Sequence, residues 1–98
     1  MKVPCMAIWD LEQELKKGSI LIDMREKAEY EQAHIPGAVW MEGDCVVDNI
    51  LGEGKEKTYI LYCERGNRSL QAACRLVKEE YSVFSIVGGF EAYRAYKD

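Results

Sequence analysis

The segment from Cys63 to Ser69 holds the residues best suited to chemistry. Its sequence is Cys63-Glu64-Arg65-Gly66-Asn67-Arg68-Ser69. A cysteine thiol becomes a nucleophile once it ionises, and two neighbouring arginines favour the thiolate. The glycine can adopt a positive φ, which lets successive backbone amides curl around an anion. We therefore expect Cys63 to be a nucleophile in a loop that binds an anion.

The elements on either side of this loop strengthen that expectation. Residues 58–62 are rich in aromatic and β-branched side chains and predict a strand that ends just before Cys63. Residues 68–80 have apolar side chains at helical spacing. Ligands of parallel sheets bind beyond the carboxyl ends of strands, and the unpaired amides of a helix start favour negative charge. A lone cysteine is more often a core residue, but this combination favours a nucleophile.

The remaining segments predict an α/β protein with a parallel sheet. Short apolar runs alternate with segments of helical spacing, as expected when helices connect parallel strands. The predicted strands are residues 3–8, 19–23, 38–41, 58–62 and 82–87, and the predicted helices are residues 10–17, 26–33, 68–80 and 90–97. Residues 43–54 are expected to form a short irregular or helical excursion. We expect one domain over residues 1–98.

Composition excludes several kinds of partner. The chain has 98 residues, with 17 acidic and 13 basic side chains and a net charge of −4. Nucleic acid is not expected, because a duplex-binding protein needs a basic face. Charged residues interrupt every apolar segment before the roughly 18 residues needed to cross a bilayer, so no membrane is expected. The first apolar run is too short for a signal peptide, which predicts a cytoplasmic protein.

The four cysteines are best considered one at a time. In a reducing compartment they are not expected to form disulfides, and their spacing includes no C-x-x-C pair for zinc, so no metal is expected. Cys74 lies near the apolar stripe of the helix after the loop and is expected in the core. The roles of Cys5 and Cys45 stay open. Cys45 could be a resolving thiol for Cys63 if its segment folds over the loop.

Other residues that could do chemistry are expected to be structural. His34 precedes a Pro-Gly pair at a chain reversal, and a thiolate stabilised by amides needs no separate base. Asp23 and Arg25 follow a strand, where an ion pair that pins the turn is commoner than substrate contact. Whether these two residues touch the loop stays open. The two tryptophans, Trp9 and Trp40, are expected to lie in the core or to cover the sheet.

Three segments of the chain, in order, resemble motifs of the rhodanese-like, or sulfurtransferase, family. Residues 63–69 look like that family's Cys-x-x-Gly-x-Arg-Ser loop. Two further matches are Leu21-Ile22-Asp23-Met24-Arg25 with Glu29-Tyr30 and His34-Ile35-Pro36-Gly37-Ala38, and then Val87-Gly88-Gly89-Phe90. The matches run from about residue 20 to residue 93. They imply a rhodanese-like α/β fold, a central parallel sheet of about five strands with helices on both faces.

The resemblance also implies a reaction. The Cys63 thiolate would take a sulfane sulfur from a small anionic donor, thiosulfate or a protein persulfide, and become a persulfide. It would then pass that sulfur to cyanide or a thiol. Backbone amides from Glu64 to Ser69 would stabilise the anionic sulfur, and Arg65 and Arg68 would attract the donor. No metal or organic cofactor is implied.

Two other functions remain to be weighed. Cysteine-based phosphatases and arsenate reductases have one residue more between the cysteine and the arginine, whereas this chain has four, Glu64 to Asn67. The shorter loop favours sulfur over a tetrahedral oxyanion. A non-catalytic interaction module with the same fold is the other alternative, although it need not retain the cysteine and both arginines. The physiological donor and acceptor, and the oligomeric state, stay open.

Overall fold

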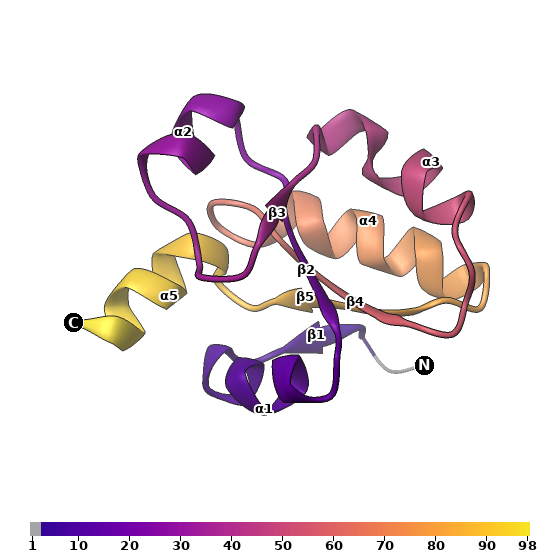
Figure 1. Ribbon diagram of the computed structural model, residues 1–98, viewed down its shortest axis with the longest axis horizontal. Coiled ribbons are helices and arrows are strands. Elements are labelled where there is room, and N and C mark those ends of the chain that lie inside the picture. Colours follow the sequence, from indigo (N-terminus) through magenta and orange to yellow (C-terminus); the bar gives the residue numbers. More distant parts are fainter. Residues whose placement is uncertain (1–2) are drawn as a thin grey trace.

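A parallel sheet with helices on both faces forms the centre of the computed structural model, which describes residues 3–98 (Figure 1). The strands are β1 (Cys5–Met6), β2 (Ile20–Asp23), β3 (Val39–Trp40), β4 (Thr58–Tyr62) and β5 (Ser82–Ile86). Within residues 3–98 they form one five-stranded sheet of order β1-β5-β4-β2-β3, and every neighbouring pair is parallel. This sheet confirms the predicted fold class. Met1 and Lys2, part of the segment that predicted no signal peptide, lie outside the described residues.

Helices connect the strands, and several begin or end one or two residues from their predicted bounds. The 3₁₀ helices are η1 (Ile8–Asp10) and η2 (Gly43–Cys45), and the α-helices are α1 (Leu11–Lys16), α2 (Lys27–Gln32), α3 (Val46–Leu51), α4 (Asn67–Lys78) and α5 (Gly89–Lys97). The excursion predicted over residues 43–54 is thus η2 followed by α3. Among residues 3–98, no helix has the length and apolar character that crossing a membrane requires.

Strand β4 lies between β5 and β2, which explains its apolar sequence. Its residues alternate between the two faces of the sheet: Tyr59 and Leu61 pack on one face, and Ile60 and Tyr62 pack on the other. All four are at most 4% exposed. Because both faces are covered, the strand that leads to Cys63 is rigidly held.

Two hydrophobic clusters, one on each face of the sheet, fill the core. The first joins the sheet to α3 and α4, and its members include Ile22, Val46, Ile50, Leu61, Leu76 and Tyr81. The second joins the sheet to α1 and α5, and it includes Leu11, Leu21, Ile60, Tyr62, Ile86 and Phe90. Figure 1 shows the same division, with α3 and α4 on one side of the strands and α1 and α5 on the other. These clusters fix the loop between β4 and α4 against the sheet.

The N-terminal segment departs most from prediction. A strand was expected over residues 3–8, but only Cys5 and Met6 pair with β5, and Ile8 begins η1. The turn of η1 leaves Trp9 68% exposed, so the expectation that Trp9 lies in the core or covers the sheet is wrong. Trp40 is half-buried, and its Nε1 donates to the Arg25 carbonyl oxygen at 2.8 Å. Cys74, expected in the core, is half-buried on α4.

Candidate active site

The Cys63 sulfur lies at the start of the loop that joins β4 to α4, among groups that donate hydrogen bonds. The backbone amides of Gly66 and Ser69 donate to Sγ at 3.2 and 3.4 Å. The Ser69 hydroxyl lies 3.4 Å from the same sulfur and 2.7 Å from the Ser85 hydroxyl. Cys63 is only 6% exposed. The loop therefore wraps the sulfur closely, as the glycine and the helix start predicted.

This surrounding lowers the pKa of the Cys63 thiol. Burial is the largest single influence and raises the pKa, because it disfavours the charged form. Hydrogen bonds from the Ser69 hydroxyl and from the amides of Ser69, Gly66 and Arg68 act in the opposite direction. Together they outweigh burial, so the net shift is downward. The site thus favours a thiolate, the reactive form of cysteine.

Glycines hold the loop in this conformation. Gly66 has φ of +102° as the N-cap of α4, and its Cα faces the backbone of Gly88 and Ile86 closely enough that a Cβ would contact both. The start of α5 then binds the loop from outside. The Phe90 and Glu91 amides donate to the carbonyl oxygens of Cys63 and Glu64 at 2.9 and 3.1 Å. The Gly-Gly turn singled out in the sequence therefore helps to position the loop, although all of α4 and β5 lie between them along the chain.

The two loop arginines form ion pairs at the surface. Arg65 Nε lies 3.0 Å from a Glu91 carboxylate oxygen, and its side chain is 80% exposed. Arg68 Nη2 lies 3.3 Å from Asp44 on η2. Within residues 63–69 the charged side chains are two arginines and one glutamate, Glu64. The structure adds a carboxylate partner for each, and neither partner is close to the loop in sequence.

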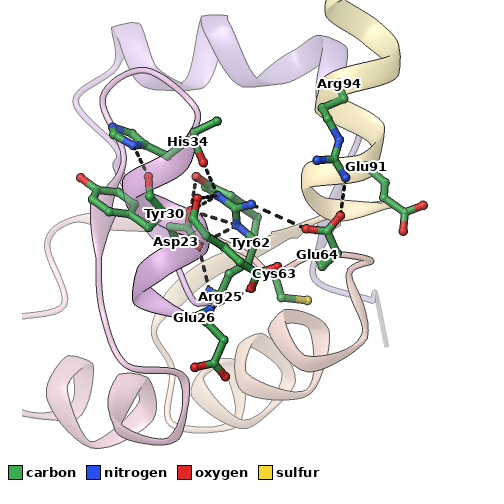
Figure 2. Close-up of polar contacts among 12 residues, drawn as sticks. Asp23, Arg25, Glu26, Tyr30, His34, Tyr62, Cys63, Glu64, Glu91 and Arg94 are labelled. Carbon is green, nitrogen blue, oxygen red and sulfur yellow. Dashed lines mark hydrogen bonds and ion pairs between the residues drawn. The ribbon is translucent and has the colours of Figure 1, made fainter.

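Asp23 and Arg25 form a buried ion pair next to the loop (Figure 2). Asp23 is fully buried and accepts hydrogen bonds from the Arg25 amide, from Arg25 Nη2 and from the Tyr62 hydroxyl, at 2.8, 2.8 and 2.7 Å. Arg25 Nη2 also donates to the Ala33 carbonyl oxygen at 2.6 Å. The pair therefore pins the turn after β2, as expected. Burial and the hydrogen bond to Asp23 raise the pKa of Tyr62, so its hydroxyl stays protonated.

Arg25 also reaches the loop, which answers a question that the sequence left open. Its Nη1 lies 3.6 Å from a Glu64 carboxylate oxygen, while Arg94 Nη2 on α5 lies 2.6 Å from the other. The Phe90 ring lies beside both guanidinium groups, with its centroid 3.9 Å from Arg25 Cζ and 4.8 Å from Arg94 Cζ. Figure 2 shows Glu64 between the two arginines. Among residues 3–98, Asp23 accepts side-chain hydrogen bonds from Tyr62 and Arg25, and it is Arg25 that reaches the loop.

A cavity of about 240 Å³ opens over the sulfur. Its lining residues are Met24, Arg25, Glu26, Glu29, Cys63, Glu64, Arg65, Asn67 and Arg68. The structure thus brings together five of the seven predicted loop residues at the cavity, while Gly66 and Ser69 contact the sulfur through their backbone amides. No spacing along the chain indicated that Met24, Glu26 and Glu29 would line the cavity, or that Arg94 would hold Glu64, because all four residues are distant from the loop in sequence.

Other candidate residues lie away from these contacts. His34 is exposed, stacks on Tyr30 with ring centroids 3.9 Å apart, and its Nδ1 lies 2.8 Å from the Tyr30 carbonyl oxygen. Cys5 and Cys45 are exposed. A hydrogen bond to Glu42 raises the pKa of Cys45, the opposite of the shift at Cys63. Within residues 3–98, no three His, Cys, Asp or Glu side chains are grouped as a metal site would require.

A rhodanese-like domain is the class of protein that this fold and site define. The family model of the rhodanese-like domain matches residues 9–96, so the chain belongs to this family. Thiosulfate sulfurtransferase GlpE of Pseudomonas savastanoi pv. phaseolicola is 35% identical over 81 residues, which are 82% of this chain and 76% of that protein. Proteins of the same name in other Pseudomonas species match equally well. These relatives identify the chain as a rhodanese-type sulfurtransferase.

Solved structures show the same fold. Reduced CoADR-RHD of Bacillus anthracis superposes with a TM-score of 0.82 at 28% identity, over 93% of this chain but only 16% of that one. A rhodanese-related protein of Thermoplasma volcanium has a TM-score of 0.82 at 21% identity, over 94% of this chain and 91% of that one. The domain therefore occurs both as most of a chain and as a small part of a longer one.

Proposed function

We propose that this protein transfers a sulfane sulfur through a persulfide on Cys63. The observation that carries the proposal is the surrounding of the Cys63 sulfur. This sulfur accepts hydrogen bonds from two backbone amides and lies within hydrogen-bond distance of the Ser69 hydroxyl. Such an arrangement stabilises negative charge on a sulfur atom. It suits a thiolate before the reaction and a persulfide anion after it.

The proposed reaction has two displacement steps. The Cys63 thiolate attacks the outer sulfur of the donor, a new S–S bond forms, and the old bond breaks with its electron pair on the leaving group. For thiosulfate the leaving group is sulfite. A cyanide or thiol acceptor then attacks the terminal sulfur of the persulfide and regenerates the Cys63 thiolate. No electrons enter or leave overall, so the residues need no redox partner or cofactor for this reaction.

The remaining loop residues have distinct proposed roles. The amides of Gly66, Arg68 and Ser69 hold the anionic sulfur, and Asn67 lines the cavity above it. Arg65 and Arg68 border the same cavity and offset charge on an anionic donor. Glu64 lines the cavity with its carboxylate paired to Arg25 and Arg94. We propose no metal ligand among these residues.

Relatives and composition support a limited set of partners. The name thiosulfate sulfurtransferase, carried by relatives at 35% identity, supports thiosulfate as a donor. A tRNA sulfurtransferase of Pyrobaculum aerophilum is 34% identical, but the match covers 14% of that protein, so we do not extend its acceptor to this chain. The net charge of −4 argues against nucleic acid. The four free thiols suit a reducing compartment such as the cytoplasm.

Two alternative functions predict different behaviour of Cys63. An interaction module without catalysis would leave a reactive but unmodified thiol after exposure to thiosulfate. A phosphatase or arsenate reductase would turn over an aryl phosphate or arsenate, for which a loop of four residues between Cys63 and Arg68 is short. The lowered pKa of Cys63 and its ordered hydrogen bonds favour chemistry over binding alone.

Thiocyanate formation from thiosulfate and cyanide tests the proposal. Wild type should be active and Cys63→Ser inactive, while Cys45→Ser, which removes an exposed thiol, should retain activity. Mass spectrometry after thiosulfate alone should find one added sulfur on the Cys63 peptide. Equal activity in wild type and Cys63→Ser, or an unmodified Cys63 peptide with active enzyme, would rule the proposal out.

A further inference from the structure

The cavity over Cys63 is less positive than its arginines suggest. Three arginines line it, and each is already paired with a carboxylate. Arg25 is paired with buried Asp23, and it also contacts Glu64. The two loop arginines are paired with carboxylates on η2 and α5. Each of these carboxylates reduces the positive potential that its arginine presents to an entering donor.

Three glutamates also line the cavity, namely Glu26, Glu29 and Glu64. The formal charges of these three glutamates and of the three lining arginines cancel. The Cys63 thiolate therefore gives the cavity a net negative charge. A second anion entering this space meets repulsion, and the repulsion grows with the charge of that anion. Thiosulfate carries two negative charges, whereas an alkyl persulfide anion, RSS⁻, carries one.

Glu64 differs from the other two glutamates in its position next to Cys63 and in its two arginine partners. It directly follows Cys63, and its carboxylate is fixed between Arg25 Nη1 at 3.6 Å and Arg94 Nη2 at 2.6 Å. Arg25 is buried against Asp23 and Phe90, so its guanidinium holds one position. The carboxylate thus adds negative charge to the cavity and also occupies the Arg25 nitrogen that faces the loop. Both effects disfavour a dianion.

We propose that Glu64 is a specificity-determining residue that disfavours thiosulfate relative to a monoanionic alkyl persulfide as sulfur donor. This inference rests on the proposed function of Cys63. In the favoured reaction the Cys63 thiolate attacks the terminal sulfur of RSS⁻. A new S–S bond forms on Cys63, the old S–S bond breaks, and its electron pair leaves on RS⁻. One sulfur atom moves from the donor to Cys63. Three sulfur atoms and two negative charges are present before and after the step, so it balances without an oxidant.

The test compares the rates at which two donors load sulfur on Cys63. The donors are thiosulfate and 2-hydroxyethyl persulfide, which has an uncharged body, and loading is followed by mass spectrometry of the Cys63 peptide under single-turnover conditions. The measured quantity is the ratio of the thiosulfate rate constant to the persulfide rate constant. This ratio cancels any change in Cys63 pKa or in the active fraction. A persulfidated cysteine in an uncharged hexapeptide serves as a second persulfide donor and separates a polypeptide source from a small thiol.

Glu64→Gln removes the carboxylate charge but keeps the shape of the side chain. It should raise the ratio of the thiosulfate to the persulfide rate constant about three- to tenfold, because it removes one negative charge near a dianion in a partly solvated site. Glu79→Gln makes the same change in net charge at the exposed end of α4 and should leave the ratio unchanged. Glu64→Asp, which keeps the carboxylate, should stay close to wild type. Both persulfides should respond to Glu64→Gln alike.

Arg94→Gln provides an independent check in the opposite direction. It removes the cation at 2.6 Å from the Glu64 carboxylate, so the ratio should fall below the wild-type value. Added salt should speed thiosulfate loading more in wild type than in Glu64→Gln, because salt screens repulsion between like charges. An unchanged ratio in Glu64→Gln, or a higher one in Arg94→Gln, overturns the inference. If Cys63 still loads sulfur in those variants, the proposed sulfur transfer through Cys63 stands, and only the role of Glu64 in donor choice is overturned.

Discussion

Removal of the Ser69 hydroxyl tests the source of Cys63 reactivity most directly. Sγ has three close donors, the amides of Gly66 and Ser69 and the Ser69 hydroxyl, at 3.2, 3.4 and 3.4 Å. Ser69→Ala removes only the third and leaves both amides in place. Because hydrogen bonds to the thiolate lower the pKa of Cys63 against the effect of burial, the variant should have a higher pKa.

The expected size follows from the geometry. A hydrogen bond to a charged group contributes about 1.5–3 kcal/mol, and a long contact to sulfur belongs at the lower end, so the pKa of Cys63 should rise by about one unit. The fraction of thiolate near neutral pH should then fall by up to about tenfold. The variant should also be less stable, since the buried Ser85 hydroxyl loses a partner at 2.7 Å.

Peptide-resolved alkylation by iodoacetamide between pH 5 and 10 measures this shift, with the range chosen as roughly that over which cysteines titrate. In wild type the Cys63 midpoint should lie below that of an ordinary thiol, and the midpoint of Cys45 should lie above it, because Glu42 raises the pKa of Cys45. Ser69→Ala should move only the Cys63 midpoint upward. Ser85→Ala is the matched control, since it removes the same 2.7 Å contact but leaves all three donors to Sγ.

Two results would refute this account of the site. If Ser69→Ala leaves the Cys63 midpoint where it is in wild type, the hydroxyl does not stabilise the thiolate. If Ser85→Ala shifts the midpoint as much as Ser69→Ala does, the effect comes from general loosening of the loop rather than from the hydrogen bond to Sγ.

The remaining predictions concern stability, measured by urea unfolding. Asp23→Asn leaves the buried Arg25 guanidinium without its buried carboxylate partner and should lower the free energy of unfolding by about 3–5 kcal/mol. Glu14→Gln, at the exposed pair with Lys17, should lower it by at most about 1 kcal/mol. A loss below that of Glu14→Gln would contradict the buried pair. Gly89→Ala places a Cβ against the Cys63 carbonyl oxygen at φ of +57° and should cost about 2 kcal/mol or more. Gly18→Ala, at φ of +92° with no atom of the described residues within 4 Å, should cost less. Equal losses would contradict close packing of Gly89 on the loop.

Local sequence determined the strand and the loop that carry Cys63. The apolar residues of β4 can be buried on both faces only in a central strand, and β4 has the predicted bounds, Thr58–Tyr62. A glycine three residues after Cys63 gives the turn that brings the next amides back to the sulfur. These features depend on neighbours along the chain, so the order of residues was enough to predict them. The short first strand was mispredicted because an edge strand is defined by its pairing with β5.

Only the tertiary structure decided the charge of the site. The sequence placed two arginines against Glu64, but their partners Asp44 and Glu91 lie on other elements, as do the arginines that hold Glu64. Packing of η2, α2 and α5 around the loop brings these groups together. Electrostatic interaction depends on distance through space, and no spacing rule along the chain reports that distance. The loop that surrounds Cys63 could thus be predicted from the sequence, while the charges gathered around the cavity could not.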